Sequence, residues 1–144
     1  CRIDHVWANV QSLEIARKAG IQAEILDSCN RIRLCDHEVR LKRRNAFGKY
    51  FSLFPFGGEV EDLTIHGAKY PLTHHHLLPN DSLCVSNEIA EEELVITFGY
   101  GTLILMELPV LYYRPECGSC NCTGRETECT GRNVPDKKNR SGCY

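Results

Sequence analysis

Cysteines are the residues whose type and spacing most strongly suggest chemistry. The chain has 9 cysteines in 144 residues, and the densest cluster is Cys117-x2-Cys120-x-Cys122-x6-Cys129. Thiolates spaced C-x2-C can hold zinc, but a structural zinc site needs a second such pair, which is missing here. Abundant cysteine is typical of disulfide-bonded proteins from an oxidising compartment. We therefore interpret the cluster as disulfides, and we assign no metal site and no cofactor.

An odd number of cysteines leaves one that stays free or joins a second chain. An intermolecular bond would make a disulfide-linked homodimer, and Cys1 and Cys143 are the easiest to spare because they lie near the termini. Spacing alone does not give the connectivity. The expected disulfide residues are Cys1, Cys29, Cys35, Cys84, Cys117, Cys120, Cys122, Cys129 and Cys143.

Three sequons favour a secreted glycoprotein. Their acceptor residues are Asn80, Asn121 and Asn139, each two positions before a Ser or Thr. The chain begins at Cys1 without a methionine, so we interpret it as a mature or trimmed product. No apolar run approaches the ~20 residues that span a bilayer, so no transmembrane segment is expected. The expected location is extracellular.

Three adjacent histidines invite a metal interpretation. Neighbouring side chains of an extended chain point to opposite faces, so of His74, His75 and His76 only the first and last could share an ion. Pro71 and Pro79 flank this tract and predict a loop. We favour an exposed or structural role for the histidines.

Catalytic motifs are missing from the sequence. It has no G-x-S-x-G elbow, no H-E-x-x-H and no Gly-rich phosphate loop. Scattered histidines at His5, His37 and His66 could serve a small secreted hydrolase as acid and base, which is kept as an alternative. We assign no catalytic residue and expect a protein that is not an enzyme.

Charge is segregated along the chain, although the net charge is only −2. That balance implies no nucleic acid partner. The basic segment consists of Arg40, Lys42, Arg43 and Arg44, and the acidic run consists of Glu88, Glu91, Glu92 and Glu93. The two runs are either solvated faces or, for the basic segment, a polyanion-binding site for a sulfated glycan.

Apolar periodicity predicts one helix, over residues 4–19. Val6, Val10 and Leu13 recur at helical spacing. Asp4 stands where an N-cap belongs, and Gly20 follows the expected end of the helix. We expect Trp7, beside this stripe, to pack against a sheet.

Alternating apolar residues predict strands after the helix. Short strands are expected over residues 21–25, 32–34, 39–41, 50–56 and 60–65, followed by a long loop over 67–82. Residues 94–98 and 102–108 are expected to form a hairpin that turns at 99–101, with the return strand continuing to residue 113. The nearly continuous apolar run of that return strand indicates that both its faces are covered.

The expected fold is mostly β. It has an antiparallel sheet with a long C-terminal hairpin, one N-terminal helix and a disulfide-rich C-terminal tail. We divide the chain into a β-rich core domain with the helix, residues 1–114, and a cysteine-rich tail stapled to it, residues 115–144. The tail has almost no large aliphatic residues, so disulfides or a metal must order it.

Residues 93–122 resemble the closing hairpin of interleukin-17-like and cystine-knot cytokines. The similar features are the strand Glu93-Leu94-Val95-Ile96, the stretch from Leu105 to Leu111 that contains Glu107 and Pro109, and the cysteines from Cys117 to Cys122. The resemblance implies that these cysteines pair back onto Cys29 and Cys35. It also implies a signalling ligand.

The leading function hypothesis is therefore a secreted extracellular signalling ligand, cystine-knot or cytokine-like, that acts by binding a protein receptor. The first alternative is another secreted interaction protein, such as an effector, an adhesion module or an ectodomain fragment, with another extracellular protein as its partner. The second alternative is the small secreted hydrolase.

Overall fold

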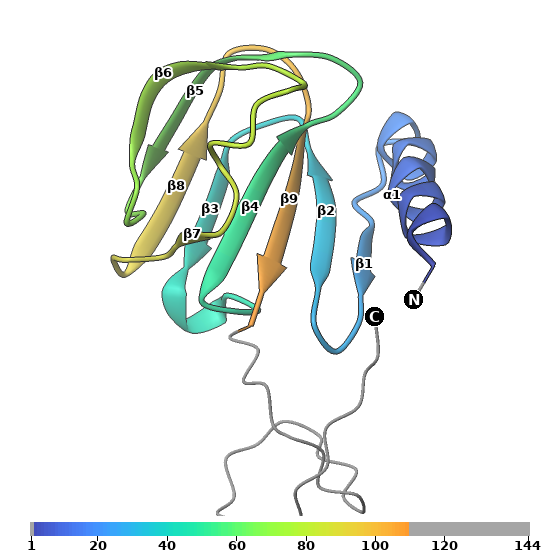
Figure 1. Cartoon of the computed structure of the whole chain (residues 1–144), viewed down its shortest axis with the longest axis horizontal. Coiled ribbons are helices and arrows are strands. Elements are labelled where there is room, and N and C mark those ends of the chain that lie inside the picture. The colour runs from blue at the N-terminus through green and yellow to red at the C-terminus, as the bar shows by residue number, and fades with distance from the viewer. Residues whose placement is uncertain (1, 110–144) are drawn as a thin grey trace, which may run out of the picture. The chain divides into compact units, whose positions relative to one another are not determined.

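One helix and nine strands make up the part of the chain that the structure, a computed structural model, describes, residues 2–109 (Figure 1). The elements are α1 (Ile3–Lys18), β1 (Glu24–Leu26), β2 (Arg31–Cys35), β3 (Val39–Lys42), the 3-10 turn η1 (Arg43–Asn45), β4 (Tyr50–Pro55), β5 (Val60–His66), β6 (Leu72–Leu77), β7 (Asn87–Glu88), β8 (Glu93–Thr97) and β9 (Leu103–Leu108).

The strands form two antiparallel sheets. The first has the order β1-β2-β9-β4-β7, and the second has the order β3-β8-β5-β6. Apolar side chains from both sheets build one core, which includes Phe51, Leu53 and Leu105 from the first sheet and Leu63 and Ile96 from the second. The mostly β, antiparallel fold class with one N-terminal helix is confirmed.

β9 is the central strand of the first sheet. It pairs with β2 on one side and with β4 on the other. Leu105 faces the core between the sheets, whereas Ile104 packs against the helix side, and both are buried. The expectation that this strand is covered on both faces is confirmed, and this burial explains why its apolar run is continuous.

α1 packs on the outer face of the first sheet through Val10 and Leu13, which contact a cluster that contains Ile32. The helix begins at Ile3, and no side chain caps it; Asp4 lies in its first turn. The expected packing of Trp7 against a sheet is wrong, because 52% of Trp7 is exposed. The buried stripe is therefore narrower than the apolar pattern suggested.

The expected C-terminal hairpin is wrong in its pairing, although both of its strands exist. β8 pairs with β3 and β5 in the second sheet, and β9 pairs with β2 and β4 in the first. The glycine-containing link between them therefore crosses from one sheet to the other. Tyr100 in this link accepts a backbone hydrogen bond from Glu61 at 3.0 Å, which holds the crossover beside β5.

The expected long loop at residues 67–82 contains a strand, β6, which pairs with β5. Its tract of threonine and histidine lacks apolar alternation, so the pattern did not indicate it. The pairing is irregular, with two register shifts, and Asp62 and His74 have positive φ angles of 60° and 52°. Such bulges are frequent at sheet edges.

Several expectations lie outside the described residues. These are the continuation of the last strand to residue 113, the disulfide-rich tail at 115–144, and Cys1, Asn121 and Asn139. The division at residue 114 remains a prediction. Over residues 2–109, the structure has no helix that is both long and apolar enough to cross a membrane.

Candidate functional site

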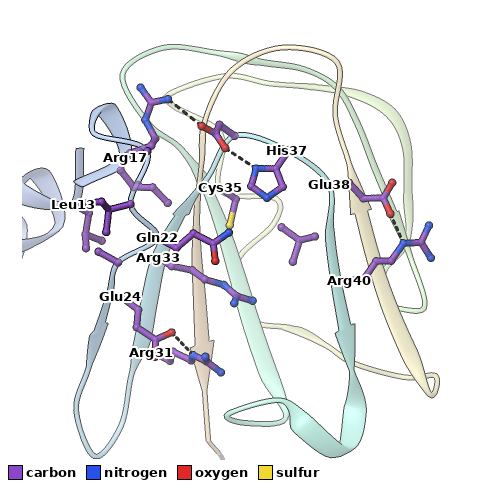
Figure 2. Close-up of a pocket in the computed structure, with 16 residues that line it drawn as sticks. Leu13, Arg17, Gln22, Glu24, Arg31, Arg33, Cys35, His37, Glu38 and Arg40 are labelled. Carbon is purple, nitrogen blue, oxygen red and sulfur yellow. Dashed lines mark hydrogen bonds and ion pairs between the residues drawn. The ribbon is translucent and has the colours of Figure 1, made fainter. Parts of the chain in front are cut away.

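A cavity of about 630 Å³ lies between the end of α1 and the strands β2 and β3 (Figure 2). Its wall includes Leu13 and Arg17 from the helix, Arg33 and Cys35 from β2, and His37 from the following turn. The volume falls in the range of small-molecule sites, about 300–1,000 Å³. Size alone therefore makes this cavity a candidate.

The charged side chains at one end of this wall form ion pairs with one another. Arg17 Nε lies 2.6 Å from the Glu14 carboxylate, and Arg17 Nη1 lies 3.3 Å from Asp36. His37 Nδ1 contacts the other oxygen of Asp36 at 2.7 Å (Figure 2). His37 and then Arg17 lower the pKa of Asp36, so this carboxylate stays charged. Because these side chains form ion pairs with one another, they offer a ligand little unpaired charge.

Two further arginines of the cavity, Arg31 and Arg40, are paired too, whereas the buried Nε and Nη2 atoms of Arg33 have no hydrogen-bond partner within the described residues. Arg31 Nε lies 2.7 Å from Glu24, and Arg40 contacts Glu38. Both contacts are seen in Figure 2. The guanidinium of Arg31 has a raised pKa, chiefly because it donates to Glu24. The cavity is thus lined by a network of internal ion pairs.

A buried carboxylate sits next to the cavity on the inner face of β9. The Glu107 side chain is 1% exposed, and its Oε1 lies 3.3 Å from Arg33 Nη2. Its Oε2 accepts a hydrogen bond of 2.9 Å from the Phe47 backbone. Glu107 therefore ties the segment after η1 to the central strand, and its role in the described structure is to position that segment.

A second constellation, which we call the Asn87 corner, consists of Ser52, Tyr70, Ser86, Asn87 and Glu88. The buried Asn87 amide accepts a hydrogen bond from Tyr70 N at 3.1 Å and donates one to Tyr70 O at 2.8 Å. Its oxygen also accepts from Glu88 N at 2.9 Å. One side chain thus fixes the backbone of β7 and of the segment before β6.

Backbone strain marks the same corner. Ser86 has a φ of 57°, which is rare for residues other than glycine. Its N–H donates to the buried Ser52 hydroxyl at 3.0 Å. Conformations of this kind cost about 1–3 kcal/mol and cluster at functional sites, so the strain supports a binding role for this corner.

Glu88 extends the corner with charge. Its carboxylate lies 3.0 Å from Lys69 and 3.0 Å from Lys49. The hydrogen bonds from Lys69 and then from Lys49 lower the pKa of Glu88. The ammonium group of Lys69 also lies 5.5 Å from the ring centre of Tyr70, which is 60% exposed. The corner therefore presents two ammonium groups and an open aromatic ring.

The three histidines face different carboxylates. His74 contacts Asp62, His75 Nε2 lies 2.8 Å from Asp81, and His76 Nε2 lies 3.2 Å from Glu59. The backbone N–H of Leu83 and then His75 lower the pKa of Asp81. His74 and His76, the two that could have shared an ion, therefore contact different carboxylates, Asp62 and Glu59.

The basic segment lies beside the acidic run that the sequence had placed apart from it. β3 pairs with β8, so Lys42 is opposite Glu93, and Arg40 Nη1 lies 3.5 Å from Glu93. Lys42 and Arg44 share a shallow hollow with Glu92 and Glu93. The acidic side chains offset much of the positive charge here. Binding of a polyanion by Arg40, Lys42, Arg43 and Arg44 remains an untested prediction.

Three of the expected disulfide cysteines lie in the described part, and none of them is bonded to another. Cys35 and Cys84 are buried, and Cys29 is half-buried. Burial raises the pKa of each of the two buried thiols to about 11. Pairing with the remaining cysteines stays a prediction. The expected acceptor Asn80 is exposed in the loop after β6.

Sequence reasoning missed the Asn87 corner. Ser86, Asn87 and Glu88 carry no motif of metal ligands, nucleophiles or glycines, and Tyr70 lies 17 residues from Asn87. The strand β7 has only two residues, too short for alternation to show. Only a structure brings these side chains together.

Comparison with known proteins gives a consistent result. Residues 36–103 match the family described as thiamin pyrophosphokinase, vitamin B1 binding domain. Thiamine pyrophosphokinase of Bacillus subtilis (strain 168) is 30% identical over 105 residues, which are 73% of this chain and 49% of the relative. The chain thus spans about half the length of the relative.

Solved structures of thiamine pyrophosphokinases are similar to this chain as well. The thiamine pyrophosphokinase of Bacillus subtilis superimposes with a TM-score of 0.72 at 30% identity, covering 77% of this chain and 52% of that chain. The enzyme of Geobacillus thermodenitrificans gives a TM-score of 0.65 at 29% identity, covering 75% and 49%. The Enterococcus faecalis family protein gives 0.63 at 26% identity, covering 74% and 50%.

These findings overturn the functional expectations. The resemblance to interleukin-17-like and cystine-knot cytokines is wrong, because the family match and the similar proteins are thiamine pyrophosphokinases. The family match also includes residues 93–103 of the segment that carried the resemblance. The expected signalling ligand and its alternatives are wrong for the same reason. The expectation of a protein that is not an enzyme is contradicted, since the relatives are kinases by name.

The expectations that assumed a secreted protein are contradicted as well. A secreted, extracellular glycoprotein with a protein receptor, a sulfated glycan or a disulfide-linked second copy as its partner is not what the relatives indicate. Over about three quarters of its length, the chain is similar to thiamine pyrophosphokinases, and its residues 36–103 match their vitamin B1 binding domain.

Proposed function

We propose that this β-sandwich binds thiamine, as the vitamin B1 binding part of a thiamine pyrophosphokinase. The observation that carries the proposal is the match of residues 36–103 to the vitamin B1 binding domain. The fold similarity at 30% identity, with a TM-score of 0.72, supports it independently of that match.

The Asn87 corner is the better of the two candidate places for the ligand. It lies inside the matched residues 36–103, whereas α1, β1 and β2, which build much of the cavity wall, precede them. The charges of the cavity and those of the corner are both paired internally, so pairing does not separate the two places. The corner in addition combines strain at Ser86 with an exposed ring at Tyr70.

The chemistry of the corner suits an aromatic cation that receives a pyrophosphoryl group. Thiamine carries a positively charged thiazolium ring, and the exposed side chain of Tyr70, which already lies 5.5 Å from the Lys69 ammonium, offers it a second cation–π contact. Lys49 and Lys69 offer donors for phosphate oxygens. Asn87 holds the backbone on which Tyr70 sits, so it acts as a positioning residue.

Calorimetry of thiamine with the 144-residue protein tests the proposal. We expect saturable binding, and we expect Tyr70→Ala to weaken it roughly twofold to thirtyfold, because a cation–π contact contributes about 0.5–2 kcal/mol. Tyr100→Ala is the matched control, since Tyr100 is also exposed but lies at the β8–β9 crossover.

The two parts of the proposal fail separately. No thiamine binding by the folded wild-type protein would reject the function. Binding that Tyr70→Ala and Tyr100→Ala weaken equally would reject only the location at the corner.

Pyrophosphoryl transfer, the activity in the relatives' name, is a separate proposal, because the chain covers only 49% of its Bacillus subtilis relative. The corresponding assay follows nucleoside triphosphate-dependent formation of thiamine diphosphate by the 144-residue protein. If the protein binds thiamine but forms no such product, its function is restricted to binding.

A further inference from the structure

Three metal-ligating side chains converge on the outer face of the β5–β6 hairpin. Glu59 precedes β5, Glu61 lies on β5, and His76 lies on β6. Their potential ligand atoms, one from each residue, all lie within 4.8 Å of one another. The imidazole Nε2 of His76 is 3.2 Å from Glu59 Oε2. In Figure 1, the hairpin lies at the edge of the second sheet.

Positive charge is scarce around these groups. In residues 2–109, no lysine or arginine forms an ion pair with Glu59, Glu61 or the neighbouring Asp62; the only partners of Glu59 and Asp62 there are His76 and His74. Elsewhere in the described part, carboxylates such as Glu88 have lysine partners. The hairpin face therefore carries negative charge that a cation would neutralise.

The backbone beneath the three side chains is held firmly. Val60 and Leu77 form a strand pair and are both 0% exposed. Glu61 donates its N–H to Tyr100 O at 3.0 Å, and its carbonyl accepts the Gly99 N–H at 2.9 Å. Side chains on rigid strands reach a ligand with less loss of freedom than side chains on loops.

We propose that Glu59, Glu61 and His76 form a binding site for a divalent transition metal ion, which we call the β5–β6 site. One neutral imidazole and two carboxylates are a borderline donor set that suits Zn²⁺ or Co²⁺ better than Mg²⁺, which prefers oxygen ligands alone. Solvent completes the coordination, because all three side chains are exposed. The site is independent of thiamine binding, since none of its residues belongs to the Asn87 corner.

Paramagnetic NMR with Co²⁺ tests this site on the full 144-residue protein. Substoichiometric Co²⁺ broadens signals near the place where it binds, so cysteines elsewhere in the chain do not confuse the result. We expect the strongest broadening at the backbone amides of Glu59, Glu61 and His76. The affinity follows from titration of these signals.

Matched variants separate the site from a general histidine effect. We expect His76→Ala to weaken Co²⁺ binding at least about tenfold, and Glu61→Gln to weaken it as well. His74→Ala is the control, because His74 belongs to the same exposed tract but contacts Asp62. Acid should also release the metal, because the imidazole must be neutral to coordinate it.

Two results would overturn the proposal. One is broadening that is absent from residues 59–76, whether or not Co²⁺ binds elsewhere. The other is an equal loss of affinity in His74→Ala and His76→Ala, which would indicate nonspecific binding to the histidine tract.

Discussion

A single buried amide holds the corner that we propose as the thiamine-binding place. Asn87 both donates to and accepts from the Tyr70 backbone, and its side chain is 3% exposed. We expect Asn87→Ala to lower the free energy of unfolding by about 1–3 kcal/mol, because it leaves buried backbone groups unpaired. Urea denaturation measures the loss.

Asn87→Asp refines this expectation. The carboxylate keeps the acceptor for Tyr70 N–H but has no N–H to donate to Tyr70 O, so it should also destabilise the protein. If either variant unfolds at the wild-type urea concentration, the amide does not hold the corner.

Two buried thiols predict an alkaline loss of stability in the reduced protein. Burial raises the pKa of Cys35 and of Cys84 from 9.0 to about 11. An unfolded thiol ionises first as the pH rises, so the thiols' contribution is fully present below pH 9 and is lost between about pH 9 and 11. The measurement is the urea midpoint from pH 8 to 11.

The control for this pH dependence is the double variant Cys35→Ala with Cys84→Ala. Lysines and tyrosines titrate in the same pH range, so only the difference between wild type and variant reports the thiols. Parallel pH profiles for the two proteins would show that the thiols do not contribute.

At the scale of elements, the central strand β9 contributes buried side chains to both apolar clusters of the described structure. Leu105 is 0% exposed and faces the second sheet. We expect Leu105→Ala to lower the free energy of unfolding by about 2–5 kcal/mol, through lost burial and the cavity left behind. Leu26→Ala, in the edge strand β1 where Leu26 is 60% exposed, should stay within about 0.5 kcal/mol. Similar urea midpoints for both variants would contradict this assignment of the core.

The turn after β5 depends on a glycine. Gly67 has a φ of 78°, and a side chain there would meet the carbonyl oxygen of Glu93 on β8. We expect Gly67→Ala to cost at least about 1–3 kcal/mol of stability, from the positive φ alone. In Gly58→Ala, the new methyl group enters open space, so that variant should change stability by no more than about 0.5 kcal/mol. Thermal unfolding of the two variants compares them directly.

Local patterns predicted most elements but not their partners. The apolar spacing of Val10 and Leu13 indicated α1, and the alternation at Ile32 and Leu34 indicated β2. β6 was not predicted, because its threonine and histidines show no alternation of apolar and polar residues. The pairing of the strands could not be predicted from the sequence. The apolar pattern around Leu105 indicates only that the strand is covered on both faces, and not which strands lie beside it.

The candidate site was even less accessible to sequence reasoning. The cysteines and sequons suggested a secretory protein, but Cys35 and Cys84 serve as small apolar side chains in the core of the described structure. The Asn87 corner depends on Tyr70 and Ser52, which are far from Asn87 in the chain. Hydrogen bonds over such distances leave no periodic signal in a sequence.

At the scale of the whole molecule, the two sheets are interleaved along the chain. The first sheet takes β1, β2, β4, β7 and β9, and the second takes β3, β5, β6 and β8. Neither sheet is therefore a contiguous segment, and both share one core. We expect a single cooperative unfolding transition for the described part, in which circular dichroism and tyrosine fluorescence coincide.

The central place of β9 also sets the order of events during synthesis. β9 joins β2 to β4, yet it is the last strand of the described chain to leave the ribosome. Until it emerges, the first sheet exists only as two separate parts with exposed apolar edges. Such long-range pairing makes folding slow. The growing chain is therefore prone to aggregate while it is being synthesised. A protein that ends at residue 102 should consequently remain protease-sensitive, although it contains eight of the nine strands.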